Sequence, residues 1–361
     1  MSVEPLPPGS TIGILGGGQL GRMLAIAAAQ IGYRCHIFAP EDAPVAGSVA
    51  DRVTRAAWDD EAALDAFAAS VDVVTLEFEN VPVATVERLA ARVPVRPGAS
   101  SLAVAQDRVE EKRFAQAEGV RVADFAVIDS AEDIAPALSR LGGSGILKSA
   151  REGYDGKGQV RLTQGDDAAE AWQAIGARRA VLEAVVPFVG EFSVLIARCI
   201  DEDTALWECP QNRHDGGILV RSVVPAEASV ARHCATAVEQ SLRLAHALDH
   251  IGVLAVEWFA CEDGPIFNEM APRVHNSGHW TIEGAATSQF ENHIRAVVGL
   301  PLGATDRIGA LVEMRNLIGE QADLWRELFA DSAAHVHLYG KEHGRAGRKM
   351  GHVTWVRGAG K

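Results

Sequence analysis

Residues 266–280 read Ile-Phe-Asn-Glu-Met-Ala-Pro-Arg-Val-His-Asn-Ser-Gly-His-Trp, an apolar strand followed by a dense group of polar side chains. Upstream, residues 252–260 form a second apolar run that a single acid, Glu257, interrupts. An acidic turn at 262–264, ending in glycine, joins the two runs and predicts a β-hairpin. Antiparallel counting about the centre of this three-residue turn places Glu257 directly opposite Glu269, on the same face.

Two facing carboxylates repel each other unless a cation lies between them. Hard cations such as Mg²⁺ bind carboxylate oxygens and complete their coordination with phosphate and water, so Glu257 and Glu269 are predicted metal ligands. The alternative is a surface hairpin with two solvated acids, which the apolar neighbours on both faces disfavour. Strict alternation turns Asn268 to the other face, so a shared role in metal binding requires a β-bulge there.

The composition predicts a soluble, cytoplasmic protein of two or three domains. The 361 residues carry a net charge of −14, which disfavours nucleic acid and anionic membranes as partners but permits a local phosphate site. The five cysteines have neither metal nor redox spacing and are expected to be reduced. Residues 1–10 lack the features of an export signal, and no later run has the length of a membrane span.

The first hundred residues alternate strands and helices, which is the pattern of a parallel α/β sheet. A strand at 11–15 leads through the glycine-rich loop at 16–21 into a helix. Such loops let backbone amides approach an anion, as in dinucleotide binding, but they also serve simply to pack a helix on its sheet. Glu79 and Asn80 follow the strand at 71–77, at the edge where open α/β sheets bind ligands, so they are either site residues or ordinary capping residues.

A second glycine-rich loop lies at 149–158, between expected strands at 146–148 and 159–162. Lys148 precedes this loop and Lys157 lies within it. Glycines let the backbone approach a nucleotide and lysines balance phosphate charge, so the segment is suited to covering ATP phosphates. A flexible hairpin without a ligand is the alternative.

The remaining elements follow from periodicity and from breaker residues. Helices are expected at 101–119, 166–177, 227–247 and 289–298, strands at 180–185, 192–198, 310–313, 335–339 and 352–356, and a polar turn at 212–219. Arg108 and Lys112 share one side of the first helix, which is usually a solvated face. The basic turn at 344–352 is either a local anion site or a solvated loop.

Four runs of residues together resemble the ATP-grasp superfamily and, within it, the ATPase subunit of phosphoribosylaminoimidazole carboxylase, which is 5-(carboxyamino)imidazole ribonucleotide synthetase. The runs are Gly16–Leu24, Gly153–Gln159, Asn268–Trp280 and Gly347–His352, and the third is the most specific. The resemblance implies an α/β protein with an ATP-grasp fold. It places a Rossmann-like parallel α/β domain at 1–100, an ATP-grasp domain at 101–300 with a glycine-loop subdomain at about 120–185, and a small β-rich domain at 301–361.

The same resemblance implies the reaction of ATP, bicarbonate and 5-aminoimidazole ribonucleotide, through carboxyphosphate, to the N-carboxylated ribonucleotide, ADP and phosphate in purine biosynthesis. It implies ATP contacts for Arg108, Lys148, Gly153, Tyr154, Asp155, Gly156, Lys157, Gly158, Gln159, Glu183, Ala184, Val185, Val186, Glu191, His214, Asn268 and Glu269, with Mg²⁺ on Glu257 and Glu269. It implies contacts to the ribonucleotide and bicarbonate for Gly18, Gln19, Leu20, Glu79, Asn80, Arg273, His275, Asn276, Arg348 and Lys349.

Catalysis is expected from Asp155, Arg273, His275 and Lys349. The arginine offers a planar fork for bicarbonate or carboxyphosphate oxygens, and either Asp155 or His275 takes the proton of the amine. Family members are typically homodimers, so a homodimer is expected. The chain stops soon after its last expected strand, so the third domain is expected to be shorter than is usual in the family.

Three other functions remain compatible with parts of the sequence. A formate-dependent phosphoribosylglycinamide transformylase shares the ATP-grasp layout and a ribonucleotide phosphate site. The loop at 16–21 permits an NAD(P)-dependent dehydrogenase. A nucleotide-sensing protein with the same fold would keep the ATP loop and lose the acids, so the presence of Glu257 and Glu269 disfavours it.

Overall fold

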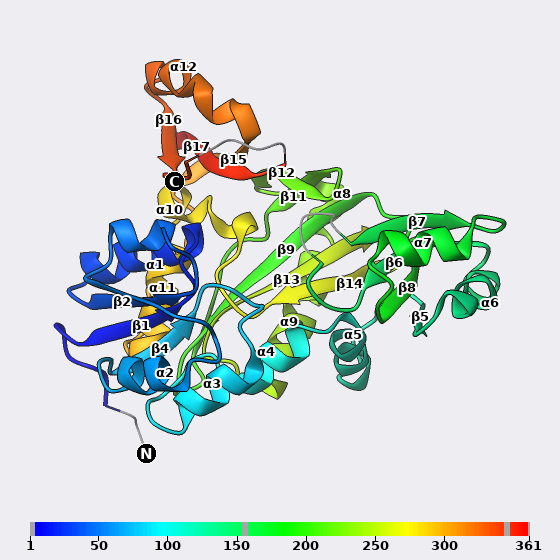
Figure 1. Ribbon diagram of the computed structural model, residues 1–361. Helices are drawn as coiled ribbons and strands as arrows, with labels where there is room; N and C mark the ends of the chain where they lie inside the picture. Colours follow the sequence, from blue (N-terminus) through cyan, green and yellow to red (C-terminus); the bar gives the residue numbers. More distant parts are fainter. Residues whose placement is uncertain (1–3, 154–157, 343–346, 360–361) are drawn as a thin grey trace.

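The computed structural model describes residues 4–153, 158–342 and 347–359. The expected site residues Tyr154, Asp155, Gly156 and Lys157 therefore lie outside the described residues. Strands of the described residues form three sheets, two of four strands and one of nine. Figure 1 shows the two small sheets on opposite sides of the large one.

The N-terminal sheet is parallel, with the strand order β3-β2-β1-β4, as the alternating pattern predicts. Its strands are β1 (Thr11–Leu15), β2 (Arg34–Ala39), β3 (Arg52–Arg55) and β4 (Val73–Leu76), and its helices are α1 (Gln19–Gln30), the 3₁₀ helix η1 (Val45–Ser48), α2 (Glu61–Ala68) and α3 (Val83–Ala90). Leu15 and Leu76 are register partners at the carboxyl ends of β1 and β4. The first glycine-rich loop and the acids after β4 consequently meet at one edge of the sheet.

The single helix expected at 101–119 is wrong, because the chain breaks it into α4 (Ala99–Ala105) and α5 (Arg108–Ala117). Asp107 causes the break: its backbone is extended and its carboxylate accepts hydrogen bonds from the N–H groups of Val109 (3.0 Å) and Glu110 (3.4 Å). The expected solvated face is also wrong for Lys112, which is 1 % exposed. The N-terminus of α5 instead faces the interior of the protein.

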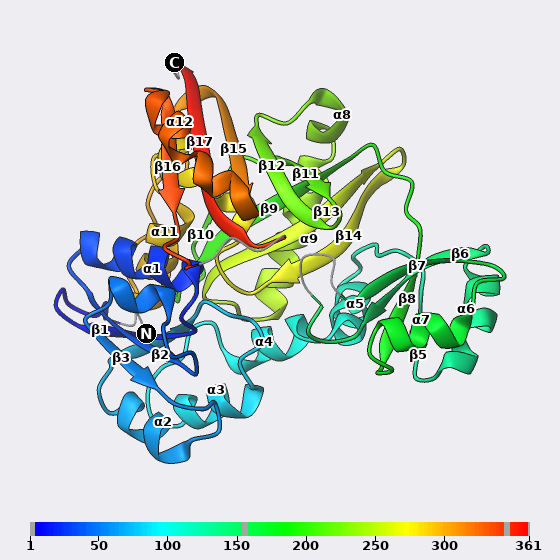
Figure 2. The same cartoon turned by 45° about the horizontal axis from the view of Figure 1, so that its top comes forward.

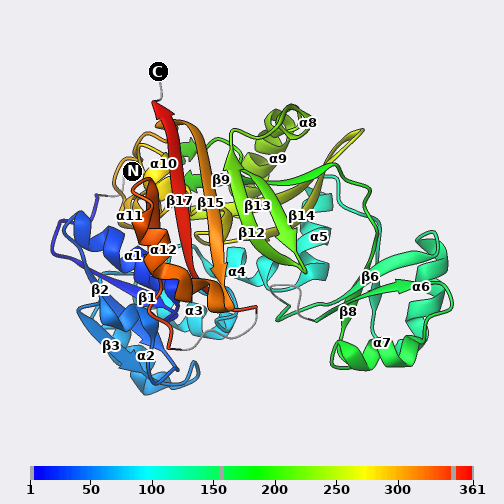
Figure 3. The same cartoon turned by 90° about the horizontal axis from the view of Figure 1, so that it is seen from above.

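The second glycine-rich loop belongs to a separate lobe, which is formed by residues 125–184. An antiparallel sheet, ordered β5-β8-β6-β7, packs with two helices around a separate apolar core that includes Leu147 and Leu182. Its elements are β5 (Phe125–Ile128), the 3₁₀ helix η2 (Ala131–Asp133), α6 (Ile134–Arg140), β6 (Ser144–Ser149), β7 (Gln159–Thr163), α7 (Ala168–Ala174) and β8 (Ala180–Ala184). Figures 2 and 3 show this lobe projecting from the rest of the molecule.

The central sheet is antiparallel and runs β14-β13-β9-β11-β12-β15-β17-β16, with β10 paired to β9. Its elements are β9 (Gly190–Arg198), β10 (Thr204–Leu206), β11 (Gln211–Asp215), β12 (Ile218–Val224), α8 (Ala228–Ala231), α9 (Cys234–Ala247), β13 (Gly252–Cys261), β14 (Gly264–Ala271), the 3₁₀ helix η3 (Asn276–Gly278), α10 (Thr281–Gly284), α11 (Gln289–Val298), β15 (Gly309–Ile318), the 3₁₀ helix η4 (Gly319–Leu324), α12 (Trp325–Ala330), β16 (Ala334–Leu338) and β17 (Lys349–Ala359). The C-terminal strands thus extend this sheet.

Two further expectations need correction. The polar turn at 212–219 is a hairpin of β11 and β12, and only Gly216 and Gly217, with φ of 56° and 81°, form its turn. The helix expected at 227–247 is two helices, α8 and α9. No helix among the described residues is both long and apolar enough to cross a membrane.

The N-terminal sheet and the central sheet share one core. Ile12 of β1, Leu195 of β9 and Met314 of β15 belong to the same buried apolar cluster. Helix α11 lies between the two sheets, where His293 Nε2 and Thr75 Oγ1 of β4 are 2.7 Å apart. This packing fixes the edge of the N-terminal sheet relative to the β13–β14 hairpin, and so positions the site described next.

Candidate active site

The β13–β14 hairpin pairs Glu257 directly with Glu269, as predicted. The turn is shorter than expected, because Cys261 pairs with Gly264 and leaves two residues between the strands. A β-bulge follows Glu257: Trp258 pairs with Phe267, two positions before Glu269. The bulge adds the residue that the shorter turn omits, so the two carboxylates still face each other.

Asn268 is the extra residue of this bulge. It is half-buried like Glu269, and its side-chain oxygen is buried without a hydrogen-bond partner among the described residues. Nowhere in the described ranges do three or more His, Cys, Asp or Glu side chains gather as a metal cluster. The hairpin therefore offers two carboxylates and one amide oxygen, an all-oxygen set that fits a hard cation such as Mg²⁺ with open positions for phosphate and water.

The two facing carboxylates have different electrostatic environments. Burial favours protonation of Glu269, but Arg108 Nη1 lies 2.7 Å from its Oε2 and outweighs burial, which lowers the pKa of Glu269 to about 2. Burial dominates at Glu257: the positive charge of His214 offsets it only in part and Glu269 adds repulsion, so the pKa of Glu257 is raised to about 7. A cation between them would favour the ionised form of Glu257.

Two histidines flank the hairpin with opposite protonation states. His214 Nδ1 lies 2.7 Å from Glu191 Oε2, and this partner outweighs burial and raises the pKa of His214 to about 9. Burial, assisted by the charges of Arg273 and Lys349, lowers the pKa of His275 to about 3. Its Nδ1 accepts a hydrogen bond from the Ser277 N–H (3.3 Å), which leaves the ring proton on Nε2, 3.6 Å from Glu257 Oε1.

A buried ion triad joins the lobe to helix α5. Glu183 of β8 lies 3.1 Å from Lys148 Nζ of β6 and 3.2 Å from Lys112 Nζ of α5. Burial raises the pKa of this carboxyl, but the two lysines outweigh burial and lower it to about 2. Lys112 also donates to the carbonyl oxygen of Asn268 (3.3 Å), so the triad connects the glycine-loop lobe to the metal-site hairpin.

Lys112→Ala is expected to destabilise the fold by about 3 kcal/mol, because it leaves a buried carboxylate with one cation instead of two. Urea denaturation measures the free energy of unfolding. Arg113→Ala, an exposed position on the same helix, is the matched control and should change that free energy by less than about 0.5 kcal/mol. Equal stability of the Lys112→Ala variant and the wild type would contradict a structural role for the triad.

The second end of the site lies where the N-terminal sheet meets the chain after β14. Arg273 forms an ion pair with Glu79, which follows β4, and its Nη1 donates to the carbonyl oxygen of Val274 at 3.0 Å. Lys349, at the start of β17, is close enough to lower the pKa of His275 and to oppose the raised pKa of Glu257. Residues from three distant parts of the sequence thus gather beside the hairpin acids.

The first glycine-rich loop is bound by a carboxylate of the chain itself. Glu77 accepts hydrogen bonds from the N–H groups of Gly18 (2.8 Å) and Gly21 (3.1 Å). A Cβ at Gly18 would lie 2.9 Å from Glu77 Oε1, so a larger residue there would displace this acid. The amides that a dinucleotide phosphate would need are therefore engaged, which argues against the dehydrogenase alternative. Leu20 packs in the core, while Gln19 is half-buried.

Other expected residues lie around this centre at different depths. Asn276 is buried and exchanges side-chain hydrogen bonds with Asn316, so its amide is already engaged. The carbonyl oxygen of Gly153 accepts from Arg108 at 3.1 Å. Half-buried positions are Asn80, Gly158, Ala184, Val185 and Val186, whereas Gln159 and Arg348 are exposed.

Sequence reasoning assigned no role to Glu77, Glu111 or Lys112 at this site. Glu111 accepts a hydrogen bond from Met270 N (2.6 Å), and burial, with repulsion from Glu269, raises its pKa to about 8. Its position three residues after Arg108 on one helix was the available signal. Glu77 is the first residue after the carboxyl end of β4, a position that is itself typical of ligand-binding loops.

Comparison with known proteins agrees with this architecture. Residues 113–290 match the family model of the ATP-grasp domain, residues 10–106 that of the ribonucleotide synthetase preATP-grasp domain, and residues 313–359 that of the phosphoribosylaminoimidazole carboxylase C-terminal domain. The fold and the site thus define an ATP-grasp ligase with a preATP-grasp domain.

Relatives that match the chain over nearly its full length identify the family within the ATP-grasp ligases. The chain is 49% identical to N5-carboxyaminoimidazole ribonucleotide synthase of Brucella melitensis, over 99% of both chains. The solved synthetase from Thermus thermophilus superposes with a TM-score of 0.88 at 45% identity, covering 96% of this chain and 93% of that one. The Aspergillus clavatus synthase, in complex with ADP and 5-aminoimidazole ribonucleotide, gives 0.90 at 28% identity, covering 97% and 94%.

The chain belongs to the N5-carboxyaminoimidazole ribonucleotide synthase family, which carboxylates 5-aminoimidazole ribonucleotide with ATP in purine biosynthesis.

Proposed function

We propose that the cleft around the β13–β14 hairpin carries out the family's reaction, the carboxylation of 5-aminoimidazole ribonucleotide with bicarbonate and ATP. The observation that carries this proposal is the facing pair Glu257 and Glu269, with Arg108 at 2.7 Å on one side and Lys148 nearby on the lobe. Two acids and two cations in one partly buried cleft suit phosphoryl transfer, which depends on positioning and charge neutralisation.

ATP is proposed to lie between the lobe and the central sheet. Lys148 and the loop from Gly153 to Gln159 would hold its phosphates, the segment after β8 (Glu183 to Val186) would contact the base, and Glu191 and His214 would bind the ribose. Lobe motion about the segment after β8 would close the glycine-rich loop over the nucleotide. The separate apolar core of the lobe supports this motion, because that core can move as a unit.

Glu257, Glu269 and the side-chain oxygen of Asn268 are proposed to hold Mg²⁺, which would neutralise phosphate charge as it develops in the transition state. Arg108 keeps Glu269 ionised in readiness for the cation. The chain's own contribution is thus a pair of oxygens held at fixed register across two hydrogen-bonded strands.

Bicarbonate and the ribonucleotide are proposed to bind beside Arg273, His275, Arg348 and Lys349. Bicarbonate is a poor electrophile, and its phosphorylation by ATP to carboxyphosphate creates a leaving group. The guanidinium of Arg273 and the ammonium of Lys349 would stabilise the oxyanions that form, at the end of the cleft opposite Lys148. Glu79, Asn80 and the Gly18 to Leu20 segment would close this end.

The proton of the attacking amine is proposed to pass to Asp155. The alternative acceptor, His275, carries its ring proton on Nε2, and its Nδ1 lone pair accepts the Ser277 N–H. That ring therefore lacks a free acceptor nitrogen directed at the cleft, although its low pKa keeps it neutral. Its Nε2–H instead faces Glu257 and supports the ionised form of that acid.

Further features remain proposals that follow from family membership. The three domains at 1–100, 101–300 and 301–361, a homodimeric assembly and a cytoplasmic location are all of this kind.

An isotope experiment tests the proposed route through carboxyphosphate. With ¹⁸O-labelled bicarbonate, one labelled oxygen is expected in the inorganic phosphate, because a bicarbonate oxygen attacks the γ-phosphorus and stays on phosphorus when the carboxyl group is transferred. Mass spectrometry of the phosphate measures the transfer. Label-free phosphate formed together with the carboxylated ribonucleotide would contradict phosphorylation of bicarbonate.

Lys148→Ala is expected to weaken ATP binding about ten- to a hundredfold, since a charge-assisted hydrogen bond to phosphate contributes about 1.5–3 kcal/mol. Titration with a non-hydrolysable ATP analogue and Mg²⁺ measures the affinity. Arg161→Ala, an exposed arginine on β7 of the same lobe, is the control and should bind the analogue like the wild type. Unchanged affinity of the Lys148→Ala variant would remove this lysine from the nucleotide site.

A further inference from the structure

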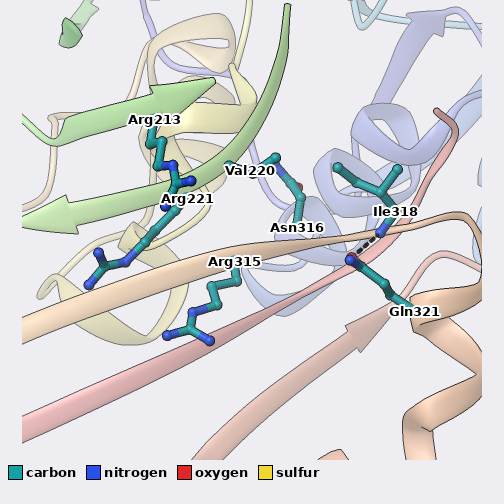
Figure 4. A pocket seen from close by; sticks show the side chains of 7 residues that line it. All are labelled: Arg213, Val220, Arg221, Arg315, Asn316, Ile318 and Gln321. Atoms are coloured by element: carbon teal, nitrogen blue, oxygen red, sulfur yellow. Dashed lines mark hydrogen bonds between the residues drawn. The ribbon is translucent and has the colours of Figure 1, made fainter. Parts of the chain in front are cut away.

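A cavity lies on the central sheet, at strands β11, β12 and β15. It has a volume of about 350 Å³, is open to solvent on one side, and is lined by Arg213, Val220, Arg221, Arg315, Asn316, Ile318 and Gln321. A smaller cavity of about 170 Å³ lies next to it and shares Arg213 and Arg221. Figure 4 shows the three arginine side chains one beneath another across the ribbons of neighbouring strands.

The three arginines form a row in register. Arg213 of β11 pairs with Arg221 of β12, and Arg221 pairs with Arg315 of β15. We call these three residues the arginine row. Like charges that face each other directly across strands destabilise a sheet, so such a row has an energetic cost unless an anion compensates it.

The arginine row faces away from the hairpin acids. Asn212 and Ser222 are the chain neighbours of Arg213 and Arg221. The Asn212 side chain donates to Ser193 Oγ at 2.6 Å and accepts from Ser222 Oγ at 2.8 Å. Ser193 is the register partner of Glu257, so this network lies on the face that carries the metal-site acids. Successive side chains of a strand point to opposite faces, and the arginine row therefore lies on the other face.

One carboxylate, that of Glu313, pairs with two members of the arginine row. Glu313 accepts from Arg221 Nη2 at 2.9 Å and also pairs with Arg315, which lowers the pKa of Glu313 against the opposing effect of burial. The Arg213 side chain has neither a hydrogen bond nor an ion pair within the described ranges. Arg221 Nε is buried without a hydrogen-bond partner there. Among the described residues, three positive charges thus share one carboxylate, on a chain whose net charge is −14.

We propose that the arginine row is a binding site for a small anion that carries two or more phosphate groups. Each guanidinium group offers a planar fork that can bind a phosphate group in a bidentate manner, and three of them lie on neighbouring strands. Gln321 accepts the Ile318 N–H with its oxygen (2.9 Å), and its amide N–H groups add neutral donors. The volume of the cavity falls in the range of small-ligand sites, which favours a compact anion over an extended acidic protein segment.

Titration calorimetry with inorganic tripolyphosphate tests this site, with the catalytic site saturated by a non-hydrolysable ATP analogue and by 5-aminoimidazole ribonucleotide. One equivalent of tripolyphosphate is expected to bind the wild type. Arg213→Gln should weaken that binding on the order of tenfold, because it removes one charge-assisted contact. Arg34→Gln, an exposed arginine on β2 of the N-terminal sheet, removes the same charge elsewhere and should leave the binding unchanged.

Several results would overturn the proposal. They are the absence of tripolyphosphate binding to the wild type, equal binding by the Arg213→Gln variant, or an equal loss in the Arg34→Gln variant, which would indicate unspecific attraction. Binding of polyglutamate in place of tripolyphosphate would assign the arginine row to an acidic protein segment. Because the catalytic cleft is filled throughout, none of these results depends on the proposed reaction.

Discussion

Glu269→Gln is expected to lower turnover by about a thousandfold or more while the protein remains folded. The substitution removes a charge that faces Glu257 directly and that Arg108 holds ionised. A cation bound by one carboxylate instead of two would no longer be fixed between the phosphates, and stabilisation of phosphoryl charge by such a cation amounts to several kcal/mol. Phosphate release, measured over a range of Mg²⁺ concentrations, reports the loss.

The control for this variant is Glu262→Gln, which removes the same charge from the exposed turn of the same hairpin and should keep full turnover. Circular dichroism checks the fold, because the Arg108 guanidinium loses its carboxylate partner while its hydrogen bond to the Gly153 carbonyl oxygen can remain. Near-normal turnover of Glu269→Gln at ordinary Mg²⁺ concentration would show that the facing acids do not hold the metal.

Arg273→Ala is expected to lower turnover about a hundred- to a thousandfold and to leave affinity for a non-hydrolysable ATP analogue nearly unchanged. The guanidinium pairs with Glu79 and lies close enough to His275 to lower its pKa, and this is where oxyanions of carboxyphosphate are proposed to form. An interaction made chiefly in the transition state affects the catalytic constant without a matching change in nucleotide affinity.

Analogue titration and turnover are measured on the same preparations of this variant. Arg326→Ala, an exposed arginine on α12, serves as the control and should match the wild type in both measurements. If Arg273→Ala instead lost analogue affinity as severely as Lys148→Ala, the arginine would belong to the nucleotide site and the proposed bicarbonate position would be wrong.

Much of the fold follows from local patterns in the sequence. The alternation of strands and helices predicts the parallel N-terminal sheet, and the two apolar runs around 262–264 predict the central hairpin. The facing of Glu257 and Glu269 was predicted correctly by a count that assumed one residue too many in the turn. The β-bulge at Asn268 supplies that residue, and bulges depend on tertiary packing and on ligands.

Features that depend on distant contacts could not be predicted. Arg108 and Lys112 lie four residues apart, which usually indicates a solvated helix face, but Asp107 caps a new helix and directs both side chains inward. Glu183, the partner that makes burial of Lys112 favourable, lies on β8, far from α5 in the sequence. Only the folded chain brings these two charges together.

The central claim is that this cleft couples ATP cleavage to the carboxylation of 5-aminoimidazole ribonucleotide. The most direct test measures ADP formation from ATP and Mg²⁺ with bicarbonate and this ribonucleotide, together and each alone, and with formate and glycinamide ribonucleotide in their place. We expect ADP formation to rise when bicarbonate and 5-aminoimidazole ribonucleotide are present together. Formate and glycinamide ribonucleotide should have no such effect. ADP formation driven by formate and glycinamide ribonucleotide, with no response to bicarbonate and aminoimidazole ribonucleotide, would contradict it.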